Sequence, residues 1–195
     1  MMRGIVTAAA IGLMALALPA AADEVEDAAK EAMELYKKGD LAGAAGQLDY
    51  AAQLIRQQKG ESLSKMLPDP LPGWTAEDAS SQATGAAMFG GGVTAERTYS
   101  KGDSSMTLAV VTDSPLLQGM MAMFTNPSMM ASSGAKLEKI AGQRASVQYD
   151  AASRSGEITM VLENRFLVTL RGNDVSKEDM VAQLGRLEAS KFAKL

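Results

Sequence analysis

The stretch ASVQYDAASRSGEITMVLENRFLVTL, residues 145–170, decides the fold class of this chain. Apolar and polar side chains alternate in three successive runs, and residues that favour turns separate the runs at 151–156 and at Asn164-Arg165. Alternation with a period of two predicts strands, and short turns make consecutive strands antiparallel neighbours. The inward positions of the three strands are Ala145, Val147 and Tyr149, then Ile158, Met160 and Leu162, then Phe166, Val168 and Leu170.

The same period occurs upstream, in residues 93–99 and 106–111, and Lys101-Gly102-Asp103-Ser104 forms the turn of a predicted hairpin. Residues 74–82 indicate a further strand. Downstream, residues 176–179 match a capping box and predict a last helix whose buried stripe is Met180, Val181, Leu184 and Leu187. We therefore expect an α+β fold, with an antiparallel sheet of about five strands and helices packed on it.

Residues 24–59 are rich in Ala, Glu, Lys, Leu and Gln, and Gly39-Asp40 interrupts them once. This composition predicts two helices joined by a tight turn. We expect two apolar stripes to pack together, formed by Ala28, Ala32, Leu35 and Tyr36 on the first helix and by Ala44, Ala45, Leu48, Ala51, Ala52 and Ile55 on the second.

The order of small residues and turn over 24–58 resembles a single tetratricopeptide-type helix pair. Leu35 and Leu48 stand where that family prefers an aromatic residue, and Arg56 replaces its closing proline. The chain has no second copy, and such units need stacked neighbours to bury their faces. A generic helical hairpin that packs on the following domain, or on a partner, is the alternative interpretation.

Three prolines within residues 68–72 exclude a helix and favour a stiff extended segment. We expect Trp74, directly after it, to anchor the chain in the core of the next domain. The predicted organisation is a signal peptide at 1–22, a helical hairpin at 23–66, a proline-rich linker at 67–73 and an α+β domain at 74–195.

The first residues of the chain have the pattern of a secretory signal peptide. A short region with Arg3 precedes the apolar run 4–18, and Ala20-Ala21-Ala22 forms an A-x-A cleavage site before Asp23. The run is too short for the roughly 20 residues that a spanning helix needs. We expect a periplasmic or secreted protein without a retained transmembrane helix.

Composition excludes several classes of function. The chain contains no His and no Cys, which removes Ser-His and Cys-His catalysis and the commonest transition-metal ligands. Cleavage after Ala22 would leave 18 basic and 23 acidic residues, a net charge of −5, which disfavours nucleic acid as a partner. The fragment Ser62-Leu63-Ser64-Lys65 matches a bare S-x-x-K spacing, without the other motifs of that enzyme class.

Two segments are candidate binding sites. The glycine-rich segment 85–92 lacks the Gly-Lys-Ser/Thr of a phosphate-binding loop, so it is either a strand connector or a loop that presents Phe89 to a partner. Ser114 and Pro115 predict the start of a helix that ends before Asn126. The second candidate is the apolar surface of this helix and of the turn after it: Met120, Met121, Met123, Phe124, Met129 and Met130.

Methionine-rich segments fill cores, form adaptable contact surfaces and ligate Cu(I), and all three interpretations apply here. We expect a non-enzymatic exported envelope protein that binds a protein or an apolar ligand and uses no cofactor. The alternative is a Met-based Cu(I)-binding protein. In the order of its elements the C-terminal domain resembles PsbP/Mog1-type α+β domains, and the whole chain resembles bacterial exported families without an assigned function; these resemblances imply a fold more than an activity.

Overall fold

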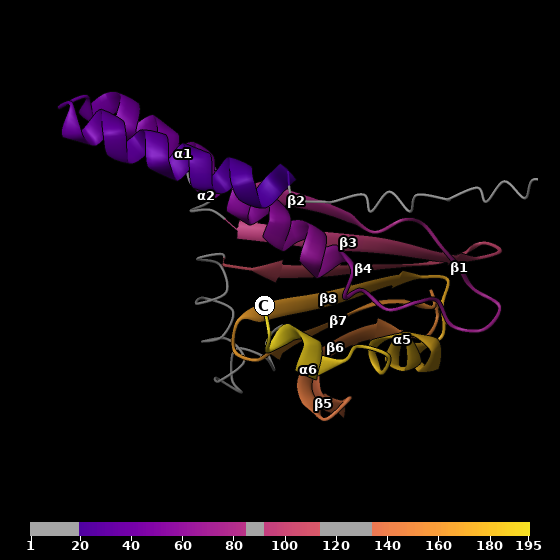
Figure 1. The fold of residues 1–195 in the computed structure, drawn as a ribbon. Coiled ribbons are helices and arrows are strands. Elements are labelled where there is room, and N and C mark those ends of the chain that lie inside the picture. Colours follow the sequence, from indigo (N-terminus) through magenta and orange to yellow (C-terminus); the bar gives the residue numbers. More distant parts are fainter. Residues whose placement is uncertain (1–19, 85–91, 114–133) are drawn as a thin grey trace, which may run out of the picture. The chain divides into compact units, whose positions relative to one another are not determined.

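The computed structural model describes residues 20–84, 92–113 and 134–195. The chain divides into two compact units, residues 1–51 and 52–195. The described helices are α1 (Ala20–Lys37), α2 (Leu41–Ser64), α5 (Lys177–Leu184) and α6 (Ala189–Phe192), and none of them is long and apolar enough to cross a membrane (Figure 1). Helix α2 continues across the boundary, so the first unit contains α1 and the first half of α2.

The second unit is built on an antiparallel sheet of eight strands, rather than the predicted five or so. Their order is β1-β3-β4-β8-β7-β6-β5, and β2 also pairs with β3. The five strands expected from the alternating pattern are confirmed. The further strand expected at residues 74–82 is instead two short strands, β1 and β2, and β5 was not expected. The strands are β1 (Thr75–Ala76), β2 (Ser80–Thr84), β3 (Gly92–Lys101), β4 (Ser104–Thr112), β5 (Lys136–Ile140), β6 (Gln143–Asp150), β7 (Ser155–Leu162) and β8 (Phe166–Asn173).

Turn residues fix the register of the hairpins. Lys101 pairs with Ser104, so two residues join β3 to β4, and the first of them, Gly102, has a φ of +59°. Leu162 pairs with Phe166 across the β7–β8 turn, within which Glu163 and Asn164 have φ values of 50° and 52°. Each register brings the apolar positions of neighbouring strands onto the same face of the sheet.

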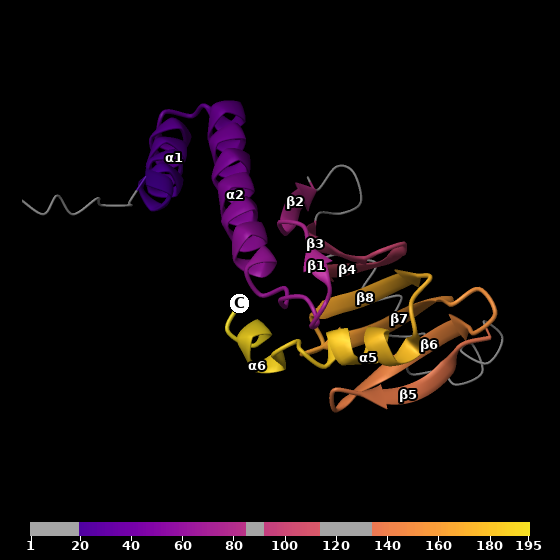
Figure 2. The same ribbon diagram turned by 90° about the vertical axis from the view of Figure 1, so that its right-hand side faces the viewer.

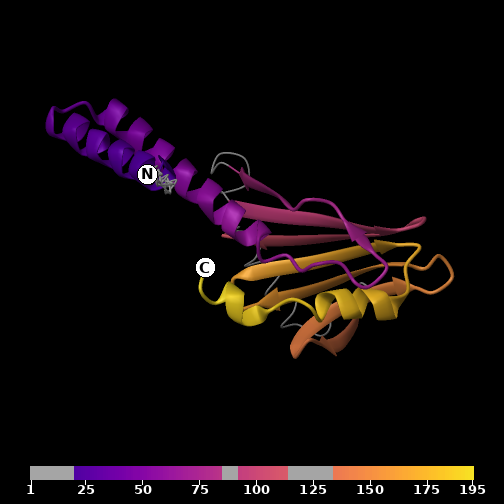
Figure 3. The same ribbon diagram turned by 45° about the vertical axis from the view of Figure 1, so that its right-hand side comes forward.

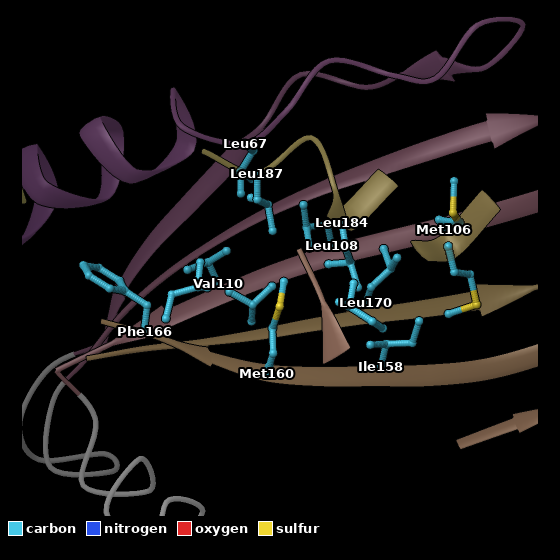
Figure 4. Close-up of a cluster of buried hydrophobic side chains, with 14 of the residues drawn as sticks. Leu67, Met106, Leu108, Val110, Ile158, Met160, Phe166, Leu170, Leu184 and Leu187 are labelled. Atoms are coloured by element: carbon cyan, nitrogen blue, oxygen red, sulfur yellow. The ribbon is translucent and has the colours of Figure 1, made fainter. Parts of the chain in front are cut away.

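The core of the second unit lies on the face of the sheet that α5 and α6 cover (Figure 2). Alternate residues of the strands point into it, and Figure 4 shows the centre of this cluster. Phe192 of α6 packs edge-on against Phe166, with ring centroids 5.3 Å apart. Trp74 is buried in the same core, which confirms its predicted role as an anchor. The sheet contributes Val93, Ala95, Tyr99, Met106, Leu108, Val110, Ile140, Ala145, Val147, Ile158, Met160, Leu162, Phe166, Val168 and Leu170.

Helix α5 begins as its capping sequence predicts. The Ser176 hydroxyl accepts the backbone N–H of Asp179 at 3.1 Å, and Met180 and Leu184 are fully buried. Gly172 of β8 makes the close packing possible, because a Cβ there would lie 2.3 Å from Val175 Cγ1 and 2.8 Å from Met180 Sδ. The absence of a side chain at Gly172 therefore sets the distance between the sheet and α5.

Gly39-Asp40 ends one helix of the first unit and starts the other. Gly39 has a φ of +84°, and the backbone N–H of Asp40 donates to the Leu35 carbonyl at 3.0 Å, as in a Schellman motif. The Asp40 carboxylate then accepts the N–H of Gly43 at 2.9 Å and caps α2. Gly39 and Asp40 together end α1 and cap the start of α2. Because so short a turn joins them, α1 and α2 are antiparallel neighbours (Figures 1 and 3).

Small residues form the contact between α1 and the first half of α2. Ala28, Ala32, Ala44 and Ala51 are buried, which confirms part of the predicted stripes. The prediction is wrong for four other apolar residues assigned to the stripes, which are exposed because alanine contacts bring the helices close along a narrow line. They are Tyr36, Ala45, Leu48 and Ile55.

Candidate functional site

A groove lies between α1 and α2 in the first unit and has a volume of about 440 Å³. Three carboxylate residues of α1, Glu24, Asp27 and Glu31, form one wall. Their spacing of three and four residues places them on one stripe of the helix. Ala28 and Leu35 supply apolar surface beside them, so the wall is apolar at its base and acidic at its rim.

The opposite wall belongs to α2 and contains two glycines. A Cβ added to Gly46 would meet nothing within 4 Å, so the space beside this residue is open. At Gly43 the Asp40 carboxylate already occupies the corresponding space, 2.5 Å from an added Cβ. Tyr50 lines the same wall, and its hydroxyl donates to Glu24 across the groove. This hydrogen bond raises the pKa of Tyr50 above its ordinary value of 10.0. We call the cavity formed by these walls the acidic groove.

Charge is distributed unevenly between the two units. Residues 23–51 carry eight acidic and three basic side chains, a net charge of −5, whereas residues 52–195 carry fifteen of each. The charge expected of the chain after Ala22 therefore belongs entirely to residues 23–51, which we call the helix pair; residues 52–195 are the sheet unit. An anionic surface of this kind attracts cationic partners and repels nucleic acid and anionic lipid.

Large apolar side chains are exposed on the other flank of the alanine contact. Met33 and Tyr36 of α1 are 60% and 68% exposed, and Leu41 and Leu48 of α2 are 65% and 56% exposed. Helical geometry places these four residues on the flank opposite the groove residues. We call them the apolar side of the helix pair.

A second cavity, of about 690 Å³, lies in the second unit beside the proline-rich segment. Its walls carry four basic and three acidic residues, several of which pair with each other: Arg97 Nη1 lies 3.4 Å from Asp69, and Lys191 Nζ lies 2.7 Å from Glu188. Arg97 also donates to the carbonyls of Glu77 and Pro68, at 3.0 and 3.1 Å. The arginine thus holds residues 67–69 and 77 against β3.

Tyr99 completes this attachment from inside the core. Its hydroxyl donates to the Pro68 carbonyl at 2.7 Å, and burial raises the pKa of Tyr99 to about 12. Gln183 of α5 donates to the Asp69 carbonyl at 3.2 Å, and its own side-chain oxygen is buried without a hydrogen-bond partner in the described structure. The polar groups around this cavity therefore act on the backbone of the proline-rich segment.

None of the candidate binding residues selected from the sequence lies in the described part of the chain. Phe89, Met120, Met121, Met123, Phe124, Met129 and Met130 all lie outside the described residues, as does most of the predicted signal peptide. Within the described part of the chain, no three acidic side chains gather closely enough to hold a metal ion. Met106, Met160 and Met180 are buried in the core.

Comparison with protein-family models, curated proteins and solved structures finds no match to this chain. The resemblances to a tetratricopeptide-type helix pair, to PsbP/Mog1-type domains and to exported bacterial families therefore remain predictions.

Sequence reasoning did not identify the acidic groove or the apolar side. The relevant signal was present, since the acidic residues at 24, 27 and 31 recur with the spacing of one helical stripe. The net charge of the whole chain does not show this local excess of carboxylates, because the excess is confined to the 29 residues 23–51.

Proposed function

We propose that this chain is an exported, non-enzymatic protein-binding module and that its helix pair makes the contact. The observation that carries the proposal is the apolar side, where four large side chains are more than half exposed within two short helices. Contiguous exposed apolar surface on a small unit is typical of a protein interaction site. The sheet unit, in contrast, serves as a stable body for the module.

The sequence supports the rest of the proposal. The pattern of residues 1–22 favours export, and a chain without His or Cys lacks the side chains that most often act as general bases, nucleophiles and metal ligands. The methionine segment that motivates the Cu(I) alternative lies outside the described residues, and no contact in the described part favours it.

The test compares the wild-type protein with a Tyr36→Ser/Leu48→Ser variant in a pull-down from an envelope extract. Both substitutions remove exposed apolar area without opening a cavity, so we expect the fold to be retained and specific partners to be lost. Thr75→Ala/Thr107→Ala, on the sheet unit, is the control and should capture the same proteins as the wild type.

Circular dichroism of each variant establishes that the helix pair is intact. Identical sets of captured proteins for wild type and the Tyr36/Leu48 variant would contradict the proposal. So would the absence of any specific partner of the wild type.

A further inference from the structure

The acidic groove supplies a second surface on the helix pair, with a chemistry different from that of the apolar side. It is an open cavity of about 440 Å³ lined by Ala28 and Leu35 of α1 and, on the α2 side, by the exposed Gly46. A cavity of this size and apolar base accommodates the side chains of one face of a helix. The absence of a side chain at Gly46 allows the backbone of an occupant to approach closely.

The rim of the groove determines the charge of its occupant. Glu24 and Glu31 are seven positions apart on α1, about 10 Å along the helix axis at 1.5 Å per residue, and Asp27 lies between them. A helix with Lys or Arg at matching intervals of three and four residues would place a cation opposite each carboxylate. Lys30 partly neutralises this rim, since its Nζ lies 3.9 Å from Asp27, and it also pairs with Glu26 at 2.8 Å.

A second copy of this chain is a poor occupant. Each helix pair has a net charge of −5, so two copies would bring like charges together within about one Debye length, roughly 8–10 Å. The sheet unit carries equal numbers of both charges and provides no compensating excess. Charge complementarity therefore favours a different molecule with a cationic face.

We infer that the acidic groove binds a cationic amphipathic helix of a partner protein, with its small apolar residues on Gly46 and its basic residues at the carboxylate rim. This inference rests on the proposal that the helix pair is a protein-binding module. It adds a separate surface and a partner chemistry to that proposal, and the two tests use different variants.

The probe is a fluorescein-labelled helical peptide in which Lys residues spaced by three and four flank a stripe of Ala and Leu. Its binding to the purified full-length protein is followed by fluorescence anisotropy at low and at physiological salt. The same peptide with Glu in place of every Lys is the charge control. We expect the Lys peptide to bind, more weakly as salt increases, and the Glu peptide not to bind.

Two variants alter the groove in independent ways. Glu24→Gln/Asp27→Asn/Glu31→Gln removes the rim charges and should weaken binding about tenfold, as expected for the loss of three exposed ion pairs. Gly46→Leu narrows the groove from the α2 wall and should weaken binding at least about tenfold by steric exclusion. Because Gly46 has open space beside it and Leu favours helix, the Leu variant should keep its fold.

The matched control is Glu26→Gln/Glu34→Gln/Asp49→Asn, which makes the same change in net charge at carboxylates outside the groove lining. It should weaken binding by no more than about threefold, since screened charges act over short distances. Equal losses in both triple variants, together with full binding by Gly46→Leu, would show attraction by net charge alone and overturn the inference.

Three further outcomes also overturn the inference. The first is failure of the Lys peptide to bind at low salt, and the second is equal binding of the Glu peptide. The third is a dimer of the wild-type chain, detected by sedimentation, that Gly46→Leu dissociates, because the groove would then hold a second copy. Loss of extract partners in the Tyr36/Leu48 variant with unchanged peptide binding would leave both proposals standing as separate surfaces.

Discussion

The helix pair and the sheet unit use their large side chains in opposite ways. The sheet unit buries Tyr99, Phe166, Phe192 and many Leu, Ile and Met side chains completely. The helix pair buries four alanines and leaves Met33, Tyr36, Leu41 and Leu48 exposed. Apolar burial at about 25 cal/mol per Å² gives the first arrangement far more stability per residue. The sheet unit is therefore the stable body, and the helix pair has apolar surface to offer a partner.

The largest expected effect is the loss of stability when a buried side chain of the sheet unit, rather than an exposed one of the helix pair, is truncated. Phe166→Ala should destabilise the sheet unit by about 3–5 kcal/mol, because it opens a cavity beneath Phe192. Leu48→Ala, an exposed side chain on the helix pair, should change stability by less than about 0.5 kcal/mol. Urea unfolding followed by fluorescence of Trp74, the only tryptophan in the chain, measures the sheet unit. A loss of stability below about 1 kcal/mol for Phe166→Ala would contradict the predicted difference between truncating a buried and an exposed side chain.

Gly172 in the sheet unit and Gly46 in the helix pair provide a second comparison, in which the expected changes in stability are of intermediate size. Gly172→Ala should destabilise the sheet unit by about 1–3 kcal/mol, since its Cβ would overlap Val175 and Met180. Gly46→Ala should instead stabilise the helix pair by about 0.5–1 kcal/mol, because its Cβ meets nothing and Ala favours helix. Circular dichroism at 222 nm reports the helix pair, and Trp74 reports the sheet. Stability changes of the same sign for both variants would contradict the described contrast between close packing at Gly172 and open space at Gly46.

The smallest loss of stability expected on changing a buried group of the sheet unit concerns the Tyr99 hydroxyl, which holds the proline-rich segment. Tyr99→Phe should cost about 1–1.5 kcal/mol near neutral pH, through loss of the hydrogen bond to Pro68. Because the folded pKa of Tyr99 is raised from 10.0 to about 12, the unfolded state loses its proton first as pH rises. The stability from this group is complete below pH 10 and declines as pH approaches 12. Urea midpoints from pH 8 to 11.5 should fall more steeply for wild type than for Tyr99→Phe, and parallel curves would contradict the role of the hydroxyl.

Sequence pattern predicted the strands that have a buried face. In β4 and β8 a period of two coincides with one buried face, and turn residues fall where the chain reverses. In β7 Thr159 is buried together with its neighbours Ile158 and Met160. The strand that was missed lies at an edge: β5, KLEKI, has charged residues at three of its five positions. The further strand predicted at residues 74–82 is divided into β1, of two residues, and β2. Such strands are specified by pairing with a neighbour, which local sequence does not encode.

The helix pair shows a different limit of sequence reasoning. Composition and Gly39-Asp40 predicted both helices and the turn correctly, but the stripe analysis assigned Tyr36 and Leu48 to the contact because they are apolar and adjacent on the helical wheel. Contact between two helices covers a narrower arc than the apolar arc of each, and alanines favour the closest approach. Which apolar residues remain exposed depends on that approach, so the apolar side could not be derived from either helix alone.

The edges of the sheet limit how this protein can associate with other chains. β5 ends the strand order and carries Lys136, Glu138 and Lys139, and the opposite edge is formed by the short β1 and the polar β2. Charged, short and polar edges resist the addition of a further strand. The protein is thereby protected against edge-to-edge aggregation at high local concentration. Recognition through strand addition is disfavoured for the same reason, and helical surfaces remain the natural place for a partner to bind.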